Sequence, residues 1–174
     1  AHGTVFTEAR TVAPWTLPST RALLTGREPE HWYGAPTLQQ TLSDAGWRTD
    51  AIVTNAFLSQ PFELDGGWDR YTYEHLLPAG DVVDLGLGVI RDNPDRDLLL
   101  MVHFMGPHIP YNEPWEFRYL WAGEQPNSLK GMTKYDLGRV RTAQSDFRQI
   151  RDFITARYDQ NVKATDDALR PLFE

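Results

Sequence analysis

The feature that most constrains the fold is an unbroken apolar run, Leu98–Val102, which lies between Asp97 and His103. Five consecutive apolar residues indicate a strand buried on both faces, because an exposed face would place a polar residue at every second position. Such strands occur in parallel sheets that helices cover on both sides. The run therefore predicts an α/β fold.

The remainder of the chain alternates between segments predicted to be helices and segments predicted to be strands. The expected loops are a turn-rich segment at residues 66–71 and a long functional loop at residues 107–133. No internal repeat interrupts this order, so the chain is expected to form a layered α/β structure. We expect an apolar stripe on the last helix to dock on the sheet. The predicted strands are residues 4–6, 49–54 and 97–104, and the predicted helices are residues 18–24, 37–44, 81–91 and about 135–169.

Composition limits the classes of function. The chain has 174 residues, 41% of them hydrophobic, which is enough for one sizeable core and predicts a single domain. A net charge of −7 without a basic run argues against nonspecific nucleic-acid binding. No stretch approaches 18 apolar residues, so we expect no membrane segment in this chain. The absence of cysteine excludes disulfides and thiolate metal sites.

The segment from Ala13 to Gly26 is the first candidate for chemistry. Pro18 suits the first turn of a helix, and Ser19 and Thr20 can cap free amides there. Thr16 is therefore expected at, or just before, a helix N-terminus, where backbone N–H groups favour an anion or the threonine alkoxide. The alternative is that Thr16 only caps an ordinary helix.

Five ordered segments carry a resemblance to a known family. Thr16-x-Pro18-Ser19-Thr20-x4-Thr25-Gly26 resembles the signature Cys/Ser-x-Pro-Ser-Arg-x4-Thr-Gly of the sulfatase family, within the alkaline-phosphatase-like superfamily. Each match alone is weak, whereas five in order over nearly the whole chain are specific. The other four are residues 3–9, Pro36-Thr37-Leu38 with Ala45-Gly46-Trp47, His103 to Tyr111 with its His-Ile-Pro-Tyr loop, and Tyr158-Asp159-Gln160-Asn161-Val162.

The resemblance implies a three-layer α/β/α sandwich with a mostly parallel sheet, alkaline-phosphatase-like and incomplete, as one domain over residues 1–174. Relatives carry an Asp-rich stretch before the nucleophile and an Asp-His-Gly motif later, and this sequence has neither. In the family those residues hold one or two divalent cations. We therefore expect a divalent metal ion (Ca, Mg, Mn or Zn) in the complete domain, with Thr16 as one ligand and flanking segments of the same domain supplying the others.

The resemblance also implies the roles of the site residues. Thr16 is the expected catalytic nucleophile and His108 a second catalytic or substrate-binding group, which donates to an anionic oxygen or protonates the leaving group. Arg21 is the expected substrate-binding cation. The family has its arginine one position earlier, where this chain has Thr20. The alternative for Arg21 is an ion pair with Glu28 or Glu30 on the surface. His31 lies near the place of a substrate-side histidine. His103 is expected to be a buried histidine satisfied by the backbone.

These groups are expected to converge because active sites of such folds gather at the carboxyl ends of parallel strands. Thr16 follows the first predicted strand, Asn55 ends the second, and His103 to His108 follow the third.

The partner is then expected to be a small-molecule sulfate or phosphate ester, and three functions remain open. The first is hydrolysis of sulfate esters at a metal-bound Thr16. The second is hydrolysis or transfer of phosphodiesters with a threonine nucleophile, which the resemblance supports because threonine cannot yield the formylglycine of sulfatases. The third is an inactive fragment or binding module, and we expect the isolated chain to have little or no activity.

Overall fold

The structure is a computed structural model, and it describes residues 4–143 and 145–174. The chain forms two compact units. The first runs up to Phe104 and includes Pro171–Glu174, and the second is Met105–Arg170. The sheet belongs to the first unit, and the longest helix belongs to the second.

The first unit is built on a three-stranded parallel sheet in the order β2-β1-β3. The central strand β1 (Arg48–Val53) pairs with β2 (Arg70–Tyr73) on one side and with β3 (Leu98–Val102) on the other. Residues 49–53 of β1 are buried, as expected for a parallel strand covered on both faces. The α/β class and the parallel sheet predicted from the sequence are confirmed.

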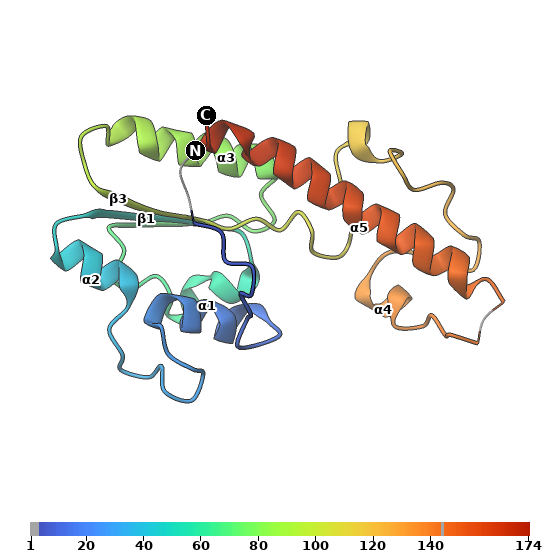
Figure 1. The fold of residues 1–174 in the computed structure, drawn as a ribbon, viewed down its shortest axis with the longest axis horizontal. Coiled ribbons are helices and arrows are strands. Elements are labelled where there is room, and N and C mark those ends of the chain that lie inside the picture. The colour runs from blue at the N-terminus through green and yellow to red at the C-terminus, as the bar shows by residue number, and fades with distance from the viewer. Residues whose placement is uncertain (1–3, 144) are drawn as a thin grey trace. The chain divides into compact units, whose positions relative to one another are not determined.

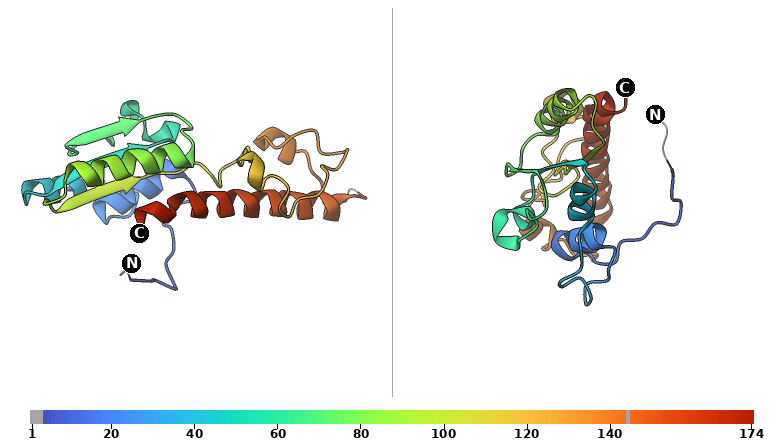
Figure 2. Two further views of the ribbon diagram at one scale, coloured as in Figure 1. Left: turned by 90° about the horizontal axis from the view of Figure 1, so that it is seen from above. Right: turned by 90° about the vertical axis from the view of Figure 1, so that its left-hand side faces the viewer.

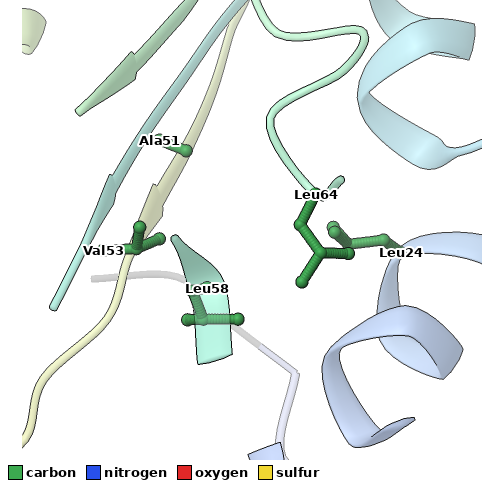
Figure 3. Close-up of a cluster of buried hydrophobic side chains, with 5 residues drawn as sticks. All are labelled: Leu24, Ala51, Val53, Leu58 and Leu64. Carbon is green, nitrogen blue, oxygen red and sulfur yellow. The ribbon is translucent and has the colours of Figure 1, made fainter. Parts of the chain in front are cut away.

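Alternating residues of β1 send their side chains to opposite faces of the sheet. Ala51 and Val53 pack against Leu24 of α1 (Thr16–Thr25) and against Leu58 and Leu64, as Figure 3 shows. The helix α2 (Leu38–Asp44) lies on this side of the sheet as well (Figure 1). Together these contacts form the first of the two helical layers.

The second helical layer is α3 (Ala79–Asp92), which packs on the opposite face of the sheet. Ile52 of β1 contacts Val82 and Val89 of this helix. Viewed from above, α3 runs alongside the strands that it covers (Figure 2, left). The expected three-layer α/β/α arrangement is thereby confirmed.

Three predictions for the first unit were wrong. Residues 4–6 form no strand among the described residues, and Val5 and Phe6 are exposed. Strand β2 begins inside the segment predicted as a loop, because the turn at Gly66 and Gly67 ends just before it. The apolar run of β3 is only half-buried along its length. Two 3₁₀ helices, η1 (Ala56–Leu58) and η2 (Gln60–Phe62), connect β1 to β2.

The second unit combines a long loop with the helix α5 (Phe147–Leu169). The loop contains a 3₁₀ turn, η3 (Trp115–Phe117), and a short helix, α4 (Lys134–Leu137). The helical segment expected from residue 135 is thus interrupted before α5 begins. Ile150 and Phe153 of the apolar stripe of α5 form a core with residues of the loop, and docking of the stripe on the sheet stays a prediction. Those loop residues are Ala122, Leu129 and Met132. A last 3₁₀ turn, η4 (Arg170–Leu172), follows α5.

A buried polar cluster fixes the loop of the second unit to α5. The Glu113 carboxylate pairs with the Arg157 guanidinium at an N–O distance of 2.8 Å and accepts a hydrogen bond from Asn161 Nδ2 at 2.7 Å. Gln160 Oε1 accepts from the backbone N–H groups of Trp121 and Ala122 at 2.9 and 2.6 Å. Buried polar groups are stable only when they are paired, and this cluster pairs them across the loop and the helix.

None of the helices in the described part of the chain is both long enough and apolar enough to cross a membrane. The longest, α5, has buried residues such as Ile150 on one side and exposed charged residues such as Arg151 and Asp152 on the other. That pattern is typical of an amphipathic helix that packs on one side.

Candidate functional site

Thr16 is the first residue of α1, and Trp15 before it has extended backbone angles (φ −149°, ψ 163°). Trp15, not Thr16, therefore occupies the capping position, so the alternative in which Thr16 only caps the helix is wrong. The N-terminal amides also lack the expected cap from Ser19, whose hydroxyl donates to the Ala13 carbonyl at 2.7 Å. Thr20 is buried. The half-buried Thr16 hydroxyl thus lies beside a helix N-terminus, where the backbone N–H groups favour an anion.

Asn55 lies two residues after the end of β1 and contacts the Thr16 hydroxyl. Its Nδ2 donates to Thr16 Oγ1 at 3.3 Å. Its Oδ1 accepts from the backbone N–H of Phe57 at 2.9 Å and so caps η1. Because the oxygen of the amide is used by the cap, the orientation of the amide is fixed and its NH₂ group faces Thr16. The predicted convergence of Thr16 and Asn55 is confirmed.

Aromatic packing supports this contact. The Trp15 and Phe57 rings meet edge to face with their centroids 5.3 Å apart, and Phe57 meets Phe62 in the same way at 5.4 Å. The first contact joins the start of α1 to η1, and the second joins η1 to η2. Edge-to-face pairs of this kind stabilise a structure by about 0.5–1.5 kcal/mol each beyond their buried area.

His103 follows β3 and is tied to Thr54, the neighbour of Asn55. Thr54 is fully buried, its hydroxyl donates to the His103 carbonyl at 3.0 Å, and its Oγ1 lies 3.2 Å from His103 Nδ1. The ring of this half-buried histidine is therefore satisfied by a side-chain hydroxyl, where we expected the backbone. The ends of β1 and β3 thus meet, as the topology requires.

Arg21 has partners other than the Glu28 or Glu30 carboxylates that we expected as its alternative. Its Nη2 donates to the Phe62 carbonyl at 3.1 Å, and its guanidinium carbon lies 3.9 Å from the centroid of the Trp32 ring. Among the described residues no ion pair joins Arg21 to either glutamate. In this structure Arg21 links α1 to the last residue of η2.

Neither His31 nor His108 takes part in the hydrogen bond between Asn55 and Thr16. His31 is exposed beside Glu28 and Glu30, and their ligand atoms lie within 4.8 Å of one another. His108 belongs to the second unit, is exposed, and has its Nδ1 2.5 Å from the Ile109 carbonyl oxygen. The roles of both histidines at a substrate stay predictions.

The residues around Thr16 do not form a complete site for a divalent cation. Asn55 presents an NH₂ group to Thr16, and a cation requires several oxygen, nitrogen or sulfur ligands. Of the described residues, only the exposed Glu28, Glu30 and His31 form a group of three His, Asp or Glu ligands. Coordination of a metal by Thr16 therefore stays a prediction that requires ligands from elsewhere.

The sequence predicted that Thr16 and Asn55 lie close together but not the hydrogen bond between them. A signal for that bond is present, because Asn followed by Ala56 and Phe57 suits the cap of a short helix. Such a cap uses only the oxygen of the amide, so the NH₂ group can donate to another residue. The polar cluster around Glu113 was missed entirely.

The parallel sheet with helices on both faces, and a hydroxyl residue opening the helix beside the strand ends, define an α/β fold with a polar group at the carboxyl edge of its sheet. The Sulfatase family model matches residues 1–174, so the chain belongs to the Sulfatase family. No curated protein matches the sequence with significance.

Two solved structures of one bacterial domain show a similar fold. The C-terminal periplasmic domain of EcEptC from Escherichia coli, in complex with Zn, aligns with a TM-score of 0.54 and 20% identity over 88% of this chain. A second structure of that domain aligns with a TM-score of 0.52 and 19% identity over 87% of the chain. A Vibrio parahaemolyticus protein of the alkaline phosphatase superfamily aligns with a TM-score of 0.49 and 15% identity. The chain spans about half the length of the EcEptC domain, 47% and 45% in the two structures.

Proposed function

We propose that the protein containing this chain transfers a substituted phosphoryl group, one that keeps its second ester bond, from a phosphodiester through a covalent intermediate on Thr16. The observation that carries the proposal is the hydroxyl of Thr16 at the first position of α1, with Asn55 Nδ2 donating to its oxygen at 3.3 Å. Membership of the Sulfatase family supports chemistry on a tetrahedral sulfate or phosphate ester. Hydrolysis of sulfate esters is the competing substrate class, and it is disfavoured because threonine cannot form the aldehyde nucleophile of sulfatases.

Asn55 contributes by favouring the reactive form of the nucleophile. A hydrogen-bond donor to an oxygen stabilises the alkoxide more than the neutral hydroxyl, because the alkoxide carries the negative charge. The fixed amide also limits the rotamers of Thr16, so the hydroxyl is held in one orientation. The N-terminal amides of α1 favour the anionic substrate beside it.

The chemical step takes place in two displacements. Oγ1 of Thr16 attacks phosphorus as the bond from phosphorus to the leaving oxygen breaks, and the proton lost by Thr16 is returned to the leaving alkoxide through solvent. The intermediate is a phosphodiester of Thr16 that keeps the second ester group of the substrate. Water or a second alcohol then attacks its phosphorus, the bond to Thr16 Oγ1 breaks, and the Thr16 oxygen takes up the proton of the attacking water or alcohol. The zinc of the EcEptC complex suggests a divalent cation in the complete domain, where it would supply charge stabilisation.

Steady-state kinetics of the complete gene product test the proposal, with bis(4-nitrophenyl) phosphate and 4-nitrophenyl sulfate as substrates. We expect turnover of the phosphodiester, a loss of about a thousandfold or more in kcat for Thr16→Ala, and retention within about tenfold for Thr16→Ser. Asn55→Asp keeps the oxygen that caps η1 but replaces the donor to Thr16, so its kcat should also fall.

Thr7→Ala is the matched control, because Thr7 lies in an exposed turn outside the contact and should leave kcat unchanged. Equal activity of Thr16→Ala and the wild-type protein would place the chemistry elsewhere. Turnover of the sulfate ester alone would reverse the choice between the two substrate classes.

A further inference from the structure

A groove in the second unit lies outside the Thr16 site and has a composition of its own. Its volume is about 470 Å³, and it runs between the loop segment 121–127 and the first half of α5. Volumes of this order are typical of small-molecule sites. One wall carries the indole of Trp121, which is 57% exposed, and the base contains the buried Phe153 and Ala122.

The wall that carries Trp121 is held from beneath by the buried polar cluster. Gln160, which is fully buried, accepts from the backbone N–H groups of Trp121 and Ala122 and donates to the Arg118 carbonyl at 2.8 Å. Gln160 Nε2 also lies 3.3 Å from Glu113 Oε1. The backbone that carries the exposed Trp121 side chain is therefore held in place. Because this part of the loop is already ordered, less conformational entropy is lost when a ligand binds.

The polar side chains of the groove define the charge of its ligand. Glu124 and Asp152 are the carboxylates, and all the lining residues are described, with no lysine or arginine among them. Asp152 is paired with Arg151 at 2.6 Å, but both are exposed, and an exposed pair contributes little and leaves the carboxylate accessible. An anionic ligand is disfavoured by the carboxylates, so the groove is unsuited to the sulfate or phosphate group itself.

Three amides complete the lining. Gln125, Asn127 and Gln149 each offer an NH₂ donor and a carbonyl acceptor. The Gln125 Nε2 donates to the Leu129 carbonyl at 2.6 Å, which leaves its oxygen for a ligand and orders the turn. Hydroxyl groups both donate and accept, and so they match a set of amides and carboxylates better than a purely cationic or purely apolar group does.

We propose that this groove binds a neutral carbohydrate, with the indole of Trp121 against the apolar face of a sugar ring and the amides and carboxylates against its hydroxyls. A sugar ring has one face of C–H groups and a rim of hydroxyls, and an aromatic residue with a polar rim matches both. The sugar can belong to a soluble glycan or to the head group of a glycolipid, since both present the same chemistry. The proposal does not depend on the function proposed for Thr16.

Saturation-transfer NMR and calorimetry with the full chain test the proposal, using cellobiose, maltose, lactose and diacetylchitobiose as probes. We expect at least one disaccharide to bind with a Kd on the order of 1 mM. Binding of a disaccharide identifies a soluble ligand. If its affinity rises when the same sugar is displayed on a lipid vesicle, the source is a glycolipid.

Trp121→Ala should weaken binding by about tenfold, while Trp121→Phe should retain most of it because the flat ring remains. Trp115→Ala is the matched control, since Trp115 is 71% exposed and lies outside the groove, and it should leave the Kd within about twofold. Asn127→Ala should weaken binding, and the exposed Asn112→Ala should not. Thr16→Ala should bind as the wild-type protein does, so failure of one proposal is distinguishable from failure of the other.

Two results would overturn the proposal. The first is no saturation transfer to any of the four disaccharides at about ten times the expected Kd. The second is binding of plain phosphatidylcholine vesicles without binding of the sugars, because the exposed Trp115, Tyr119 and Leu120 would then mark a lipid-facing surface.

Discussion

The buried pair of Glu113 and Arg157 gives the largest stability effect that the structure predicts. The Glu113 side chain is completely buried and the Arg157 side chain is 13% exposed. The carboxylate accepts from Arg157 Nη2 at 3.0 Å and from Asn161 Nδ2 at 2.7 Å, besides its 2.8 Å pair with Arg157 Nε. Glu113→Ala removes all of these contacts and leaves a guanidinium that is nearly enclosed without its partner.

Removing one partner of a buried ion pair costs about 3–5 kcal/mol, and the amides left unpaired add to that cost. Glu113→Gln keeps the shape of the side chain but removes its charge, so it should lower the free energy of unfolding by less than Glu113→Ala does. Asp152→Ala breaks the pair with Arg151, in which both side chains are more than half exposed, and should cost about 1 kcal/mol or less.

Native-state hydrogen exchange measures these costs in the second unit alone, at the amides of Trp121 and Ala122, which are bonded to Gln160. We expect the protection of both amides to fall sharply in Glu113→Ala and to stay near the wild-type value in Asp152→Ala. Equal protection in the two variants would refute the reasoning that burial makes the Glu113 pair important.

Two further predictions concern single contacts. Burial, with a smaller contribution from Asp65, raises the pKa of the Tyr71 phenol above its ordinary value, and its hydroxyl donates to the Leu58 carbonyl at 2.7 Å. Because the raised pKa belongs to the folded state, the contribution of Tyr71 to the free energy of unfolding is present below about pH 10 and is lost as pH rises. The melting temperature should therefore fall more steeply at alkaline pH for the wild type than for Tyr71→Phe. Parallel curves of melting temperature against pH would contradict this. A Cβ on Gly106 would overlap the Thr165 hydroxyl, so Gly106→Ala should lower the melting temperature more in the wild-type background than in Thr165→Ala. Equal shifts in the two backgrounds would exclude that clash.

Strands β1 and β3 of the sheet were predictable because their signal is local. The run of β3 and the β-branched residues of β1 mark strands in the sequence whatever surrounds them. Strand β2 has only four residues directly after a glycine-rich turn, so the turn signal concealed it. The apolar stripe of α5 was predicted, but a stripe does not specify its partner, and the loop residues around Leu129 supplied one.

The polar contacts were harder to predict because they join residues that are far apart in the sequence. Thr16 and Asn55 are 39 positions apart, and Glu113 and Asn161 are 48 apart. Polar residues on a helix are usually solvent-exposed, so Gln160 and Asn161 gave no sign of burial. The signal that was available is the spacing of Arg157, Gln160 and Asn161, which lie three and four positions apart on one face of α5.

The most direct test of the role of Thr16 is to trap its phosphorylated form. The complete gene product is mixed with bis(4-nitrophenyl) phosphate, quenched in acid and digested with trypsin, which releases residues 11–21 as one peptide between Arg10 and Arg21. Mass spectrometry then locates any added 4-nitrophenyl phosphoryl group among the hydroxyl residues of that peptide. We expect this group on Thr16 during turnover and none in Thr16→Ala. Turnover with the group on another residue, or with an unmodified Thr16 throughout the burst phase, would contradict the role proposed for Thr16.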